Sequence, residues 1–312
     1  MGVMMSTTEE KLKLGEKILN FKIPFRKDLL YEENITFGFE IEYCYAKTSQ
    51  VCDELFEKGF NWEHHYEPTV RELDKFERSR GGEVVSPIIR GSDPKWDDLK
   101  QICELIKFCL GEVNEKTAGH IHLGTQIFTS IDNHSNNFLF LWEAFEDIIK
   151  KFFYGEFIEG DFFKKYAPLY QDEFKKANYD YWTLKKKRAS LNRETKYYGV
   201  NFNNFRDLQE RKDNTIEIRA ICGTLEPEIW QNNLNFLINF IKWCDNITKE
   251  ELVFIKNNYN LKDNKLFAFD KALFLADNIF SQDIDKMCFL KQYFKDFYIE
   301  NPSLQRVKLI DR

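Results

Sequence analysis

The stretch ITFGFEIEYCY, residues 35–45, alternates in the manner of a half-buried β-strand. Successive strand side chains point to opposite faces, so the alternation assigns each residue to one face. The face opposite the apolar side chains carries Glu40 and Glu42, which repel each other unless a cation lies between them. A solvated strand face would show the same pair, so that alternative stays open. The apolar face would comprise Ile35, Phe37, Phe39, Ile41, Tyr43 and Tyr45.

Two more stretches place functional side chains two residues apart. GHIHLGTQIF, residues 119–128, puts His120 and His122 on one face of an expected strand. NTIEIRAIC, residues 214–222, puts Glu217 and Arg219 on the face opposite its isoleucines. If the three strands share a sheet, carboxylates, imidazoles and a guanidinium line one surface, which suits divalent-cation and phosphate chemistry. Glu217 and Arg219 could instead form a simple ion pair.

The composition excludes several classes of protein. The chain has 312 residues, 43% hydrophobic and 16% aromatic, which is enough for one large domain or two small ones. The net charge of −6 argues against a nucleic-acid-binding protein, whose surface is basic. No apolar run reaches 18 residues, so we expect no membrane span. Seven cysteines without a CxxC motif indicate reduced thiols and a cytoplasmic protein.

The pattern along the chain predicts one α+β domain. We expect an N-terminal arm or helix over 1–30, the main part of the domain over 31–247, and a helical extension of the same domain over 248–312. Ser92 or Asp93 should cap a helix that begins at Pro94. His64 and His65 fall in a polar stretch that we interpret as a surface loop. Further helices are expected around 8–20, 51–60, 136–153 and after Thr224, and strands over 83–85 and 197–202.

Two further segments could serve a site. Gly81 and Gly82 precede Glu83, and glycines permit positive φ or close backbone approach. The run KKKRASLNRETK, residues 185–196, is either a solvated surface or a loop that contacts nucleotide phosphates. The common phosphate-binding motifs GxxxxGK[ST] and GxGxxG do not occur.

Taken in order, five short motifs resemble the amidoligases, which are relatives of glutamine synthetase and glutamate–cysteine ligase. The motifs are FGFEIEY at 37–43, GGEVVSPI at 81–88, AGHIHLG at 118–124, KYYGVNF at 196–202 and TIEIRAICGTLEPEIW at 215–230. The resemblance covers about 35–245. It implies an α+β fold with a glutamine-synthetase-like, curved, mostly antiparallel sheet and helices packed on its outer face. A helical C-terminal region follows from the sequence pattern.

The resemblance also implies roles for individual residues. ATP and two or three Mg²⁺ or Mn²⁺ ions would bind, and Arg219 would grip the transferred phosphoryl group. His120 would sit on the cation that bridges the nucleotide phosphates, with His122 beside it as a further catalytic residue. Relatives carry an Asp-x-Ser element where this chain has Glu67-Pro68-Thr69, and Glu67 is our candidate for the proton acceptor. The implied metal ligands are Glu40, Glu42, Glu83, His120 and Glu217. The expected nucleotide contacts are Lys187, Arg188, Arg193, Asn201 and Arg219.

The activity implied by this resemblance is an ATP-dependent ligase that joins a carboxylate and an amine through an acyl phosphate. The substrates would be small molecules or peptides, and neither nucleic acid nor membrane is an expected partner. Two alternatives stay open, which are an inactive nucleotide- or metal-binding relative and a metal-dependent hydrolase. The sequence sets neither the identity of the acid and amine nor the oligomeric state.

Overall fold

A computed structural model describes residues 8–70, 72–73, 79–128, 131–154, 199–201, 214–259 and 268–294 of the protein. The chain divides into two compact units. The sheet unit contains Phe25–Ile131 and Glu159–Gln231, and the helical unit contains Met1–Pro24, Asp132–Ile158 and Asn232–Arg312. The division expected at residues 30 and 247 stays a prediction.

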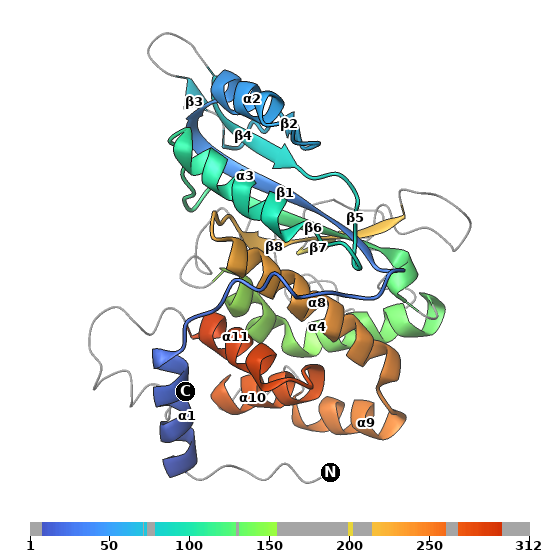
Figure 1. The fold of residues 1–312 in the computed structure, drawn as a ribbon. Coiled ribbons are helices and arrows are strands. Elements are labelled where there is room, and N and C mark those ends of the chain that lie inside the picture. Colours follow the sequence, from blue (N-terminus) through green and yellow to red (C-terminus); the bar gives the residue numbers. More distant parts are fainter. Residues whose placement is uncertain are drawn as a thin grey trace. The chain divides into compact units, whose positions relative to one another are not determined.

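One sheet forms the centre of the sheet unit, and every pairing among its described strands is antiparallel. The strand order is β2-β4-β1-β6-β8-β7, while β3 pairs with β4 and β5 pairs with β1 (Figure 1). The α+β class and the mostly antiparallel sheet are thereby confirmed. The strands are β1 Thr36–Lys47, β2 Glu63–His65, β3 Glu72–Leu73, β4 Ser79–Val85, β5 Ile89–Arg90, β6 Ala118–Gly124, β7 Val200–Asn201 and β8 Thr215–Cys222.

Strand β1 shows the predicted alternation as far as Tyr43. Its apolar side chains from Phe37 to Tyr43 are buried. Tyr45 departs from the prediction, because its φ of 67° and a register shift between Tyr43 and Lys47 turn its side chain outward, where it is 38% exposed. This irregularity in the β1–β4 ladder buries Cys44 and Ala46 instead.

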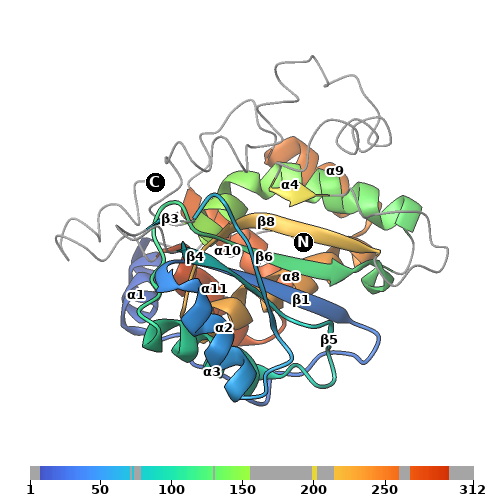
Figure 2. The same ribbon diagram turned by 90° about the horizontal axis from the view of Figure 1, so that it is seen from above.

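Helices α2 Thr48–Glu57 and α3 Trp96–Phe108 pack on the apolar side of the sheet. Helix α2 contacts β1 and β4, and helix α3 places the Trp96 ring against Phe37 with centroids 6.1 Å apart. Figure 2 shows α2 and α3 together on one side of β1. The predicted start of α3 at Pro94 is wrong, because Lys95 adopts a left-handed conformation and the helix begins after it.

The strand predicted over residues 119–128 is shorter than expected. β6 ends at Gly124, and Thr125–Ile127 form a 3₁₀ turn in which the Phe128 N–H donates to the Thr125 carbonyl oxygen. Near the other end of β6, Gly119 lies against the indole of Trp230, where an added Cβ would come within 2.3 Å of the ring. The glycine therefore lets this aromatic ring pack directly on the strand backbone.

The helical unit confirms the predicted helical C-terminal region. Its aromatic core joins three helices, since Phe152 of α4 lies 5.0 Å from Phe236 of α8 and 4.9 Å from Phe289 of α11 between ring centroids. Its helices are α1 Thr8–Asn20, α4 Ile131–Tyr154, α8 Pro227–Asn246, α9 Lys249–Asn258, α10 Ala268–Ile279 and α11 Asp283–Tyr293, although α4 and α8 each begin within the sheet unit.

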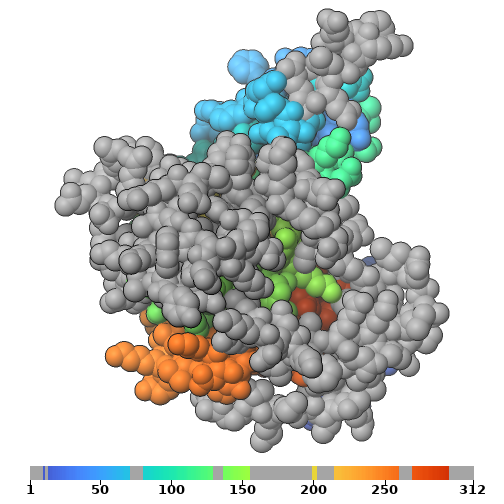
Figure 3. All heavy atoms as spheres, turned by 180° about the vertical axis from the view of Figure 1, so that it is seen from behind, coloured from blue at the N-terminus to red at the C-terminus, as the bar shows by residue number. Residues whose placement is uncertain are grey.

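Helix α9 reaches the molecular surface, where its atoms appear orange in the space-filling view (Figure 3). Thr248 caps it, accepting the Glu251 N–H while the Glu251 carboxylate accepts the Thr248 N–H. Among the described residues, no helix has both the length and the apolar character needed to cross a lipid bilayer.

Candidate functional site

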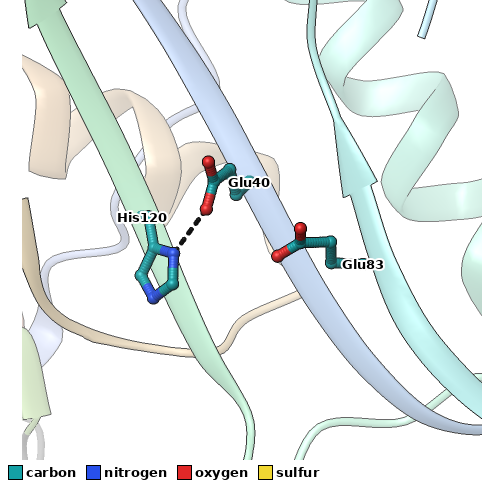
Figure 4. Close-up of side chains that lie close together, drawn as sticks. All are labelled: Glu40, Glu83 and His120. Atoms are coloured by element: carbon teal, nitrogen blue, oxygen red, sulfur yellow. Dashed lines mark hydrogen bonds and ion pairs between the residues drawn. The ribbon is translucent and has the colours of Figure 1, made fainter. Parts of the chain in front are cut away.

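The register of β1 and β6 brings the first two functional pairs together. Glu40 lies directly opposite His120, and Gly38 lies opposite His122. Directly opposed residues of an antiparallel pair project to the same face, so the glutamates of β1 and the histidines of β6 share one side of the sheet. Figure 4 shows Glu40 and His120 pointing toward each other, with Glu83 approaching from the neighbouring strand β4.

His120 lies at the centre of this group and is only 3% exposed. Its Nδ1 lies 2.5 Å from Glu40 Oε2 and 3.6 Å from Glu217 Oε1, while its Nε2 lies 3.8 Å from Glu42 Oε1. Burial favours the neutral imidazole, but the hydrogen bond to Glu40 and the charges of Glu40 and Glu42 outweigh burial and raise the pKa of His120. A single imidazole thus contacts carboxylates from two strands.

Glu40 accepts hydrogen bonds from both histidines, because His122 Nε2 lies 2.7 Å from its second carboxylate oxygen. Burial alone would raise the pKa of Glu40. The hydrogen bonds and positive charges of His120 and His122 have the larger combined effect and hold this pKa well below its usual value. Glu40 therefore stays ionised, with each of its two oxygens fixed in a different direction.

Glu42 is more deeply buried than Glu40. Its Oε2 accepts the Ala118 backbone N–H at 2.6 Å, which fixes the carboxylate against the start of β6. Burial raises the pKa of Glu42, although the charge of His120 and the Ala118 hydrogen bond oppose this effect. A buried carboxylate of this kind gains most from a bound cation, because the cation replaces lost solvation.

Glu83 comes from β4 and lies directly opposite Glu42. The two preceding glycines position it for different reasons. Gly81 has a φ of 83°, and a Cβ on it would lie 2.5 Å from the Val70 carbonyl oxygen. A Cβ on Gly82 would lie 2.5 Å from the His64 ring. Larger residues would therefore push both neighbouring segments away from β4.

Burial and the neighbouring charge of Glu40 raise the pKa of Glu83 to about 7. The carboxylate is thus easily protonated while no cation is near it. A carboxyl pKa raised in this way is typical of carboxylates that lie close together in a binding or catalytic site.

Glu67 belongs to the same face. Its Oε1 accepts the Thr69 backbone N–H at 2.9 Å and the Thr69 hydroxyl at 2.6 Å, so that one oxygen is held locally. A carboxylate oxygen of Glu67 lies within 4.8 Å of oxygens of Glu42 and Glu83. The structure therefore places Glu67 beside Glu42 and Glu83.

Strands β8 and β7 complete the face. Glu217 lies opposite His122, and its Oε2 accepts a hydrogen bond of 2.6 Å from the Asn201 amide. Arg219 Nη1 forms an ion pair with Glu217 Oε1. Arg219 Nε is buried and makes no hydrogen bond within the described part of the chain, so the guanidinium keeps a donor for another oxygen-rich group.

Three sets of potential cation ligands lie on this face. Within each set the ligand atoms are at most 4.8 Å apart, a separation that one cation with bonds of about 2.1 Å could span after small side-chain shifts. Two of the sets share Glu40 and two share Glu83, so neighbouring cations could use common carboxylates. The sets are Glu40, Glu83 and His120; Glu40, His122 and Glu217; and Glu42, Glu67 and Glu83. Mainly oxygen ligands with some imidazole suit Mg²⁺ or Mn²⁺.

Lys187, Arg188 and Arg193, the predicted phosphate contacts, lie outside the described residues. Two residues on the site face were missed in the sequence. His65 and Glu63 belong to strand β2 and not to a loop, although both are exposed as expected, and His65 lies directly opposite Glu83. The available signal was the spacing in Glu63-x-His65, which repeats the two-residue spacing of the other functional pairs.

A comparison with protein families shows which family the chain belongs to. A family model described as “putative amidoligase enzyme” matches residues 63–241, which is more than half of the chain. The chain belongs to the amidoligase family. No curated protein has a sequence significantly similar to it. The family match begins after β1 and so does not cover Glu40 and Glu42, which the strand pairing places opposite His120 and Glu83.

The raised pKa of Glu83 predicts how the stability of the metal-free amidoligase depends on pH. The folded protein holds a proton on Glu83 up to about pH 7, whereas the unfolded chain releases it near 4.5. Stability should therefore fall as pH rises from about 4.5 to 7, by an amount on the order of 3 kcal/mol. Glu83→Gln cannot ionise, so in EDTA its melting temperature should exceed that of the wild type at pH 8 and match it near pH 4.5. An unchanged difference between the two proteins across this range would contradict the assignment.

Proposed function

We propose that this amidoligase joins a carboxylate to an amine in an ATP-dependent reaction that passes through an acyl phosphate. The observation that carries the proposal is the overlap of the three carboxylate and imidazole sets on one sheet face, with Arg219 beside them. Family membership supports ligase chemistry. A face that shares Glu40 and Glu83 between sets suits several cations close together, as the polyphosphate of a nucleotide requires.

The proposed chemistry has two steps. A carboxylate oxygen of the acid attacks the γ-phosphorus of ATP, the bond from phosphorus to the bridging oxygen breaks, and ADP leaves. The amine nitrogen then attacks the carbonyl carbon of the acyl phosphate, the carbon–oxygen bond breaks, and inorganic phosphate leaves. The amine loses one proton to a base. The first step is required because a carboxylate has no good leaving group, whereas an acyl phosphate has one.

The chain's own residues have distinct parts in this proposal. Glu40, Glu42, Glu83, His120 and Glu217 would hold two or three Mg²⁺ or Mn²⁺ ions, which neutralise phosphate charge when bound. Arg219 would donate to the transferred phosphoryl group through nitrogens that Glu217 leaves available. Asn201 would orient Glu217, whose Oε2 it contacts, and could itself contact the nucleotide.

His122 and Glu67 would serve the reacting groups. His122 fixes one oxygen of Glu40 and is one-quarter exposed, so it can also reach a ligand on the open side of the site. Glu67 would accept the proton of the attacking amine, since Thr69 holds one of its oxygens and leaves the other available. Lys187, Arg188 and Arg193 remain predicted contacts of the nucleotide phosphates. We further propose that the sheet is curved as in glutamine synthetase, and that the substrates are small or peptide acids and amines.

Trapping with hydroxylamine tests the proposed function without knowledge of the natural amine. An acyl phosphate reacts with hydroxylamine to give a hydroxamate, which forms a coloured iron complex. Incubation with ATP, Mg²⁺, hydroxylamine and a panel of amino acids and peptides should give a hydroxamate and equimolar phosphate for at least one acid. Formation should stop with EDTA and without ATP. Cleavage of an amide substrate with a metal ion but without ATP would instead favour a hydrolase.

Arg219→Lys keeps the positive charge and removes the planar fork of donors. Loss of one preorganised donor to a transition state reduces rates by about 10²–10³-fold, so we expect hydroxamate formation to fall at least ~100-fold. The affinity for ATP with Mg²⁺, measured by calorimetry, should change little, because charge neutralisation persists. Near-normal turnover in the lysine variant would mean that Arg219 only balances the charge of Glu217.

A further inference from the structure

Strand β2 adds a fourth pair of polar side chains to the site face. His65 lies directly opposite Glu83, which in turn lies opposite Glu42 on β1. Directly opposed residues share a face, so His65, Glu83 and Glu42 form one row across three strands. Glu63 lies two residues before His65 and therefore projects to the same face.

The position of β2 is fixed from the opposite face of the sheet. The buried Tyr43 hydroxyl and His64 Nε2 form a hydrogen bond of 2.8 Å. The His64 ring fits over Gly82, where a Cβ would come within 2.5 Å of it. These contacts hold a strand of only three residues in register, and so they place His65 next to Glu83.

The two nitrogens of His65 face different carboxylates. Nε2 lies 3.2 Å from Glu63 Oε2, a hydrogen-bonding distance, whereas Nδ1 lies 3.8 Å from Glu83 Oε1. If Nε2 donates its hydrogen to Glu63, Nδ1 carries the lone pair, and Nδ1 is the ring nitrogen that lies 3.8 Å from Glu83 Oε1. A metal-binding histidine usually donates the hydrogen of its other ring nitrogen to a carboxylate, a backbone carbonyl or a water molecule. Glu63 would be that carboxylate for His65.

The separation of 3.8 Å between His65 Nδ1 and Glu83 Oε1 indicates how these two atoms could share a cation. It is too long for a hydrogen bond, and two groups with lone pairs gain nothing by facing each other directly. Two ligands of one cation, each at about 2.1 Å, lie up to about 4.2 Å apart. The separation of His65 Nδ1 and Glu83 Oε1 is therefore one that a single divalent ion could bridge.

We propose that His65 is a ligand of the cation held at Glu83, and that this imidazole makes the cation site prefer Mn²⁺ over Mg²⁺. The inference rests on the cation sites of the proposed function. Glu42 and Glu83 alone would offer this cation only oxygen, which suits Mg²⁺. Imidazole nitrogen binds Mg²⁺ poorly and transition-metal ions better, so a histidine ligand added from β2 would shift the preference of this cation site toward Mn²⁺.

Titration of EDTA-treated protein with Mn²⁺ alone, followed by electron paramagnetic resonance, tests this assignment. His65→Ala should weaken one Mn²⁺ site at least ~10-fold, the scale on which lost metal-site contacts act. Its affinity for Mg²⁺, measured by calorimetry, should change little. His65→Asp supplies oxygen in place of nitrogen and should bind Mg²⁺ better than the wild type. The nitrogen coupling in pulsed spectra of the Mn²⁺-loaded protein should fall in both variants.

Asn61→Ala is the matched control, since Asn61 is an exposed residue just ahead of β2; this variant should bind both ions like the wild type. Melting curves in EDTA verify that each variant is folded. Wild-type Mn²⁺ binding by His65→Ala, together with loss of one site in Glu83→Gln, would overturn the role of His65 and leave the proposed function standing. Wild-type binding by Glu83→Gln and by Glu40→Gln would overturn the cation sites, and both proposals with them.

Discussion

The contact between Glu40 and His120 across β1 and β6 is the interaction on which the candidate site depends. The antiparallel register places the two residues directly opposite each other, and their side-chain atoms lie 2.5 Å apart. His122 fixes the second oxygen of the same carboxylate. Because Glu40 belongs to two of the three sets of potential cation ligands, a change in this register would separate both sets.

The apolar face of β1 makes this concentration of charge tolerable. Burial of a large apolar side chain stabilises a protein by roughly 1.5–3 kcal/mol, and Phe37, Phe39 and Ile41 are all buried on the face away from the site. The carboxylates oppose folding, as the raised pKa values of Glu42 and Glu83 indicate. One face of β1 therefore stabilises the fold, while charge repulsion on its other face favours bound cations. Substitutions on the acidic face can leave the apolar packing intact.

Much of this arrangement could be predicted from the sequence, because alternation defines faces wherever apolar residues mark one of them. It placed Glu40, Glu42, His120, His122, Glu217 and Arg219 on strand faces that the structure brings together. Alternation could not predict that Tyr45 turns outward, since a positive φ at a tyrosine leaves no sequence signal. The start of α3 was misjudged for the same reason, because a left-handed Lys95 excludes the proline that otherwise marks a first turn.

Strand β2 was missed for a different reason. Its three residues, Glu63–His65, are all polar, so no apolar alternation could reveal them. Only the pairing with β4 shows that His65 belongs beside Glu83. Short strands at the edge of a sheet are defined by partners distant in sequence, and functional residues placed on them are hard to recognise without the structure.

Anomalous diffraction from crystals soaked in Mn²⁺ and a non-hydrolysable ATP analogue tests the central claim most directly, which is that the Glu40 face holds divalent cations. Data collected on either side of the manganese absorption edge locate the ions without assumptions about activity. The account predicts at least two peaks, each within bonding distance of a Glu40 oxygen and of a second ligand among Glu83, His120, His122 and Glu217. Well-diffracting crystals that contain bound nucleotide but show no peak within about 3 Å of Glu40 would contradict it.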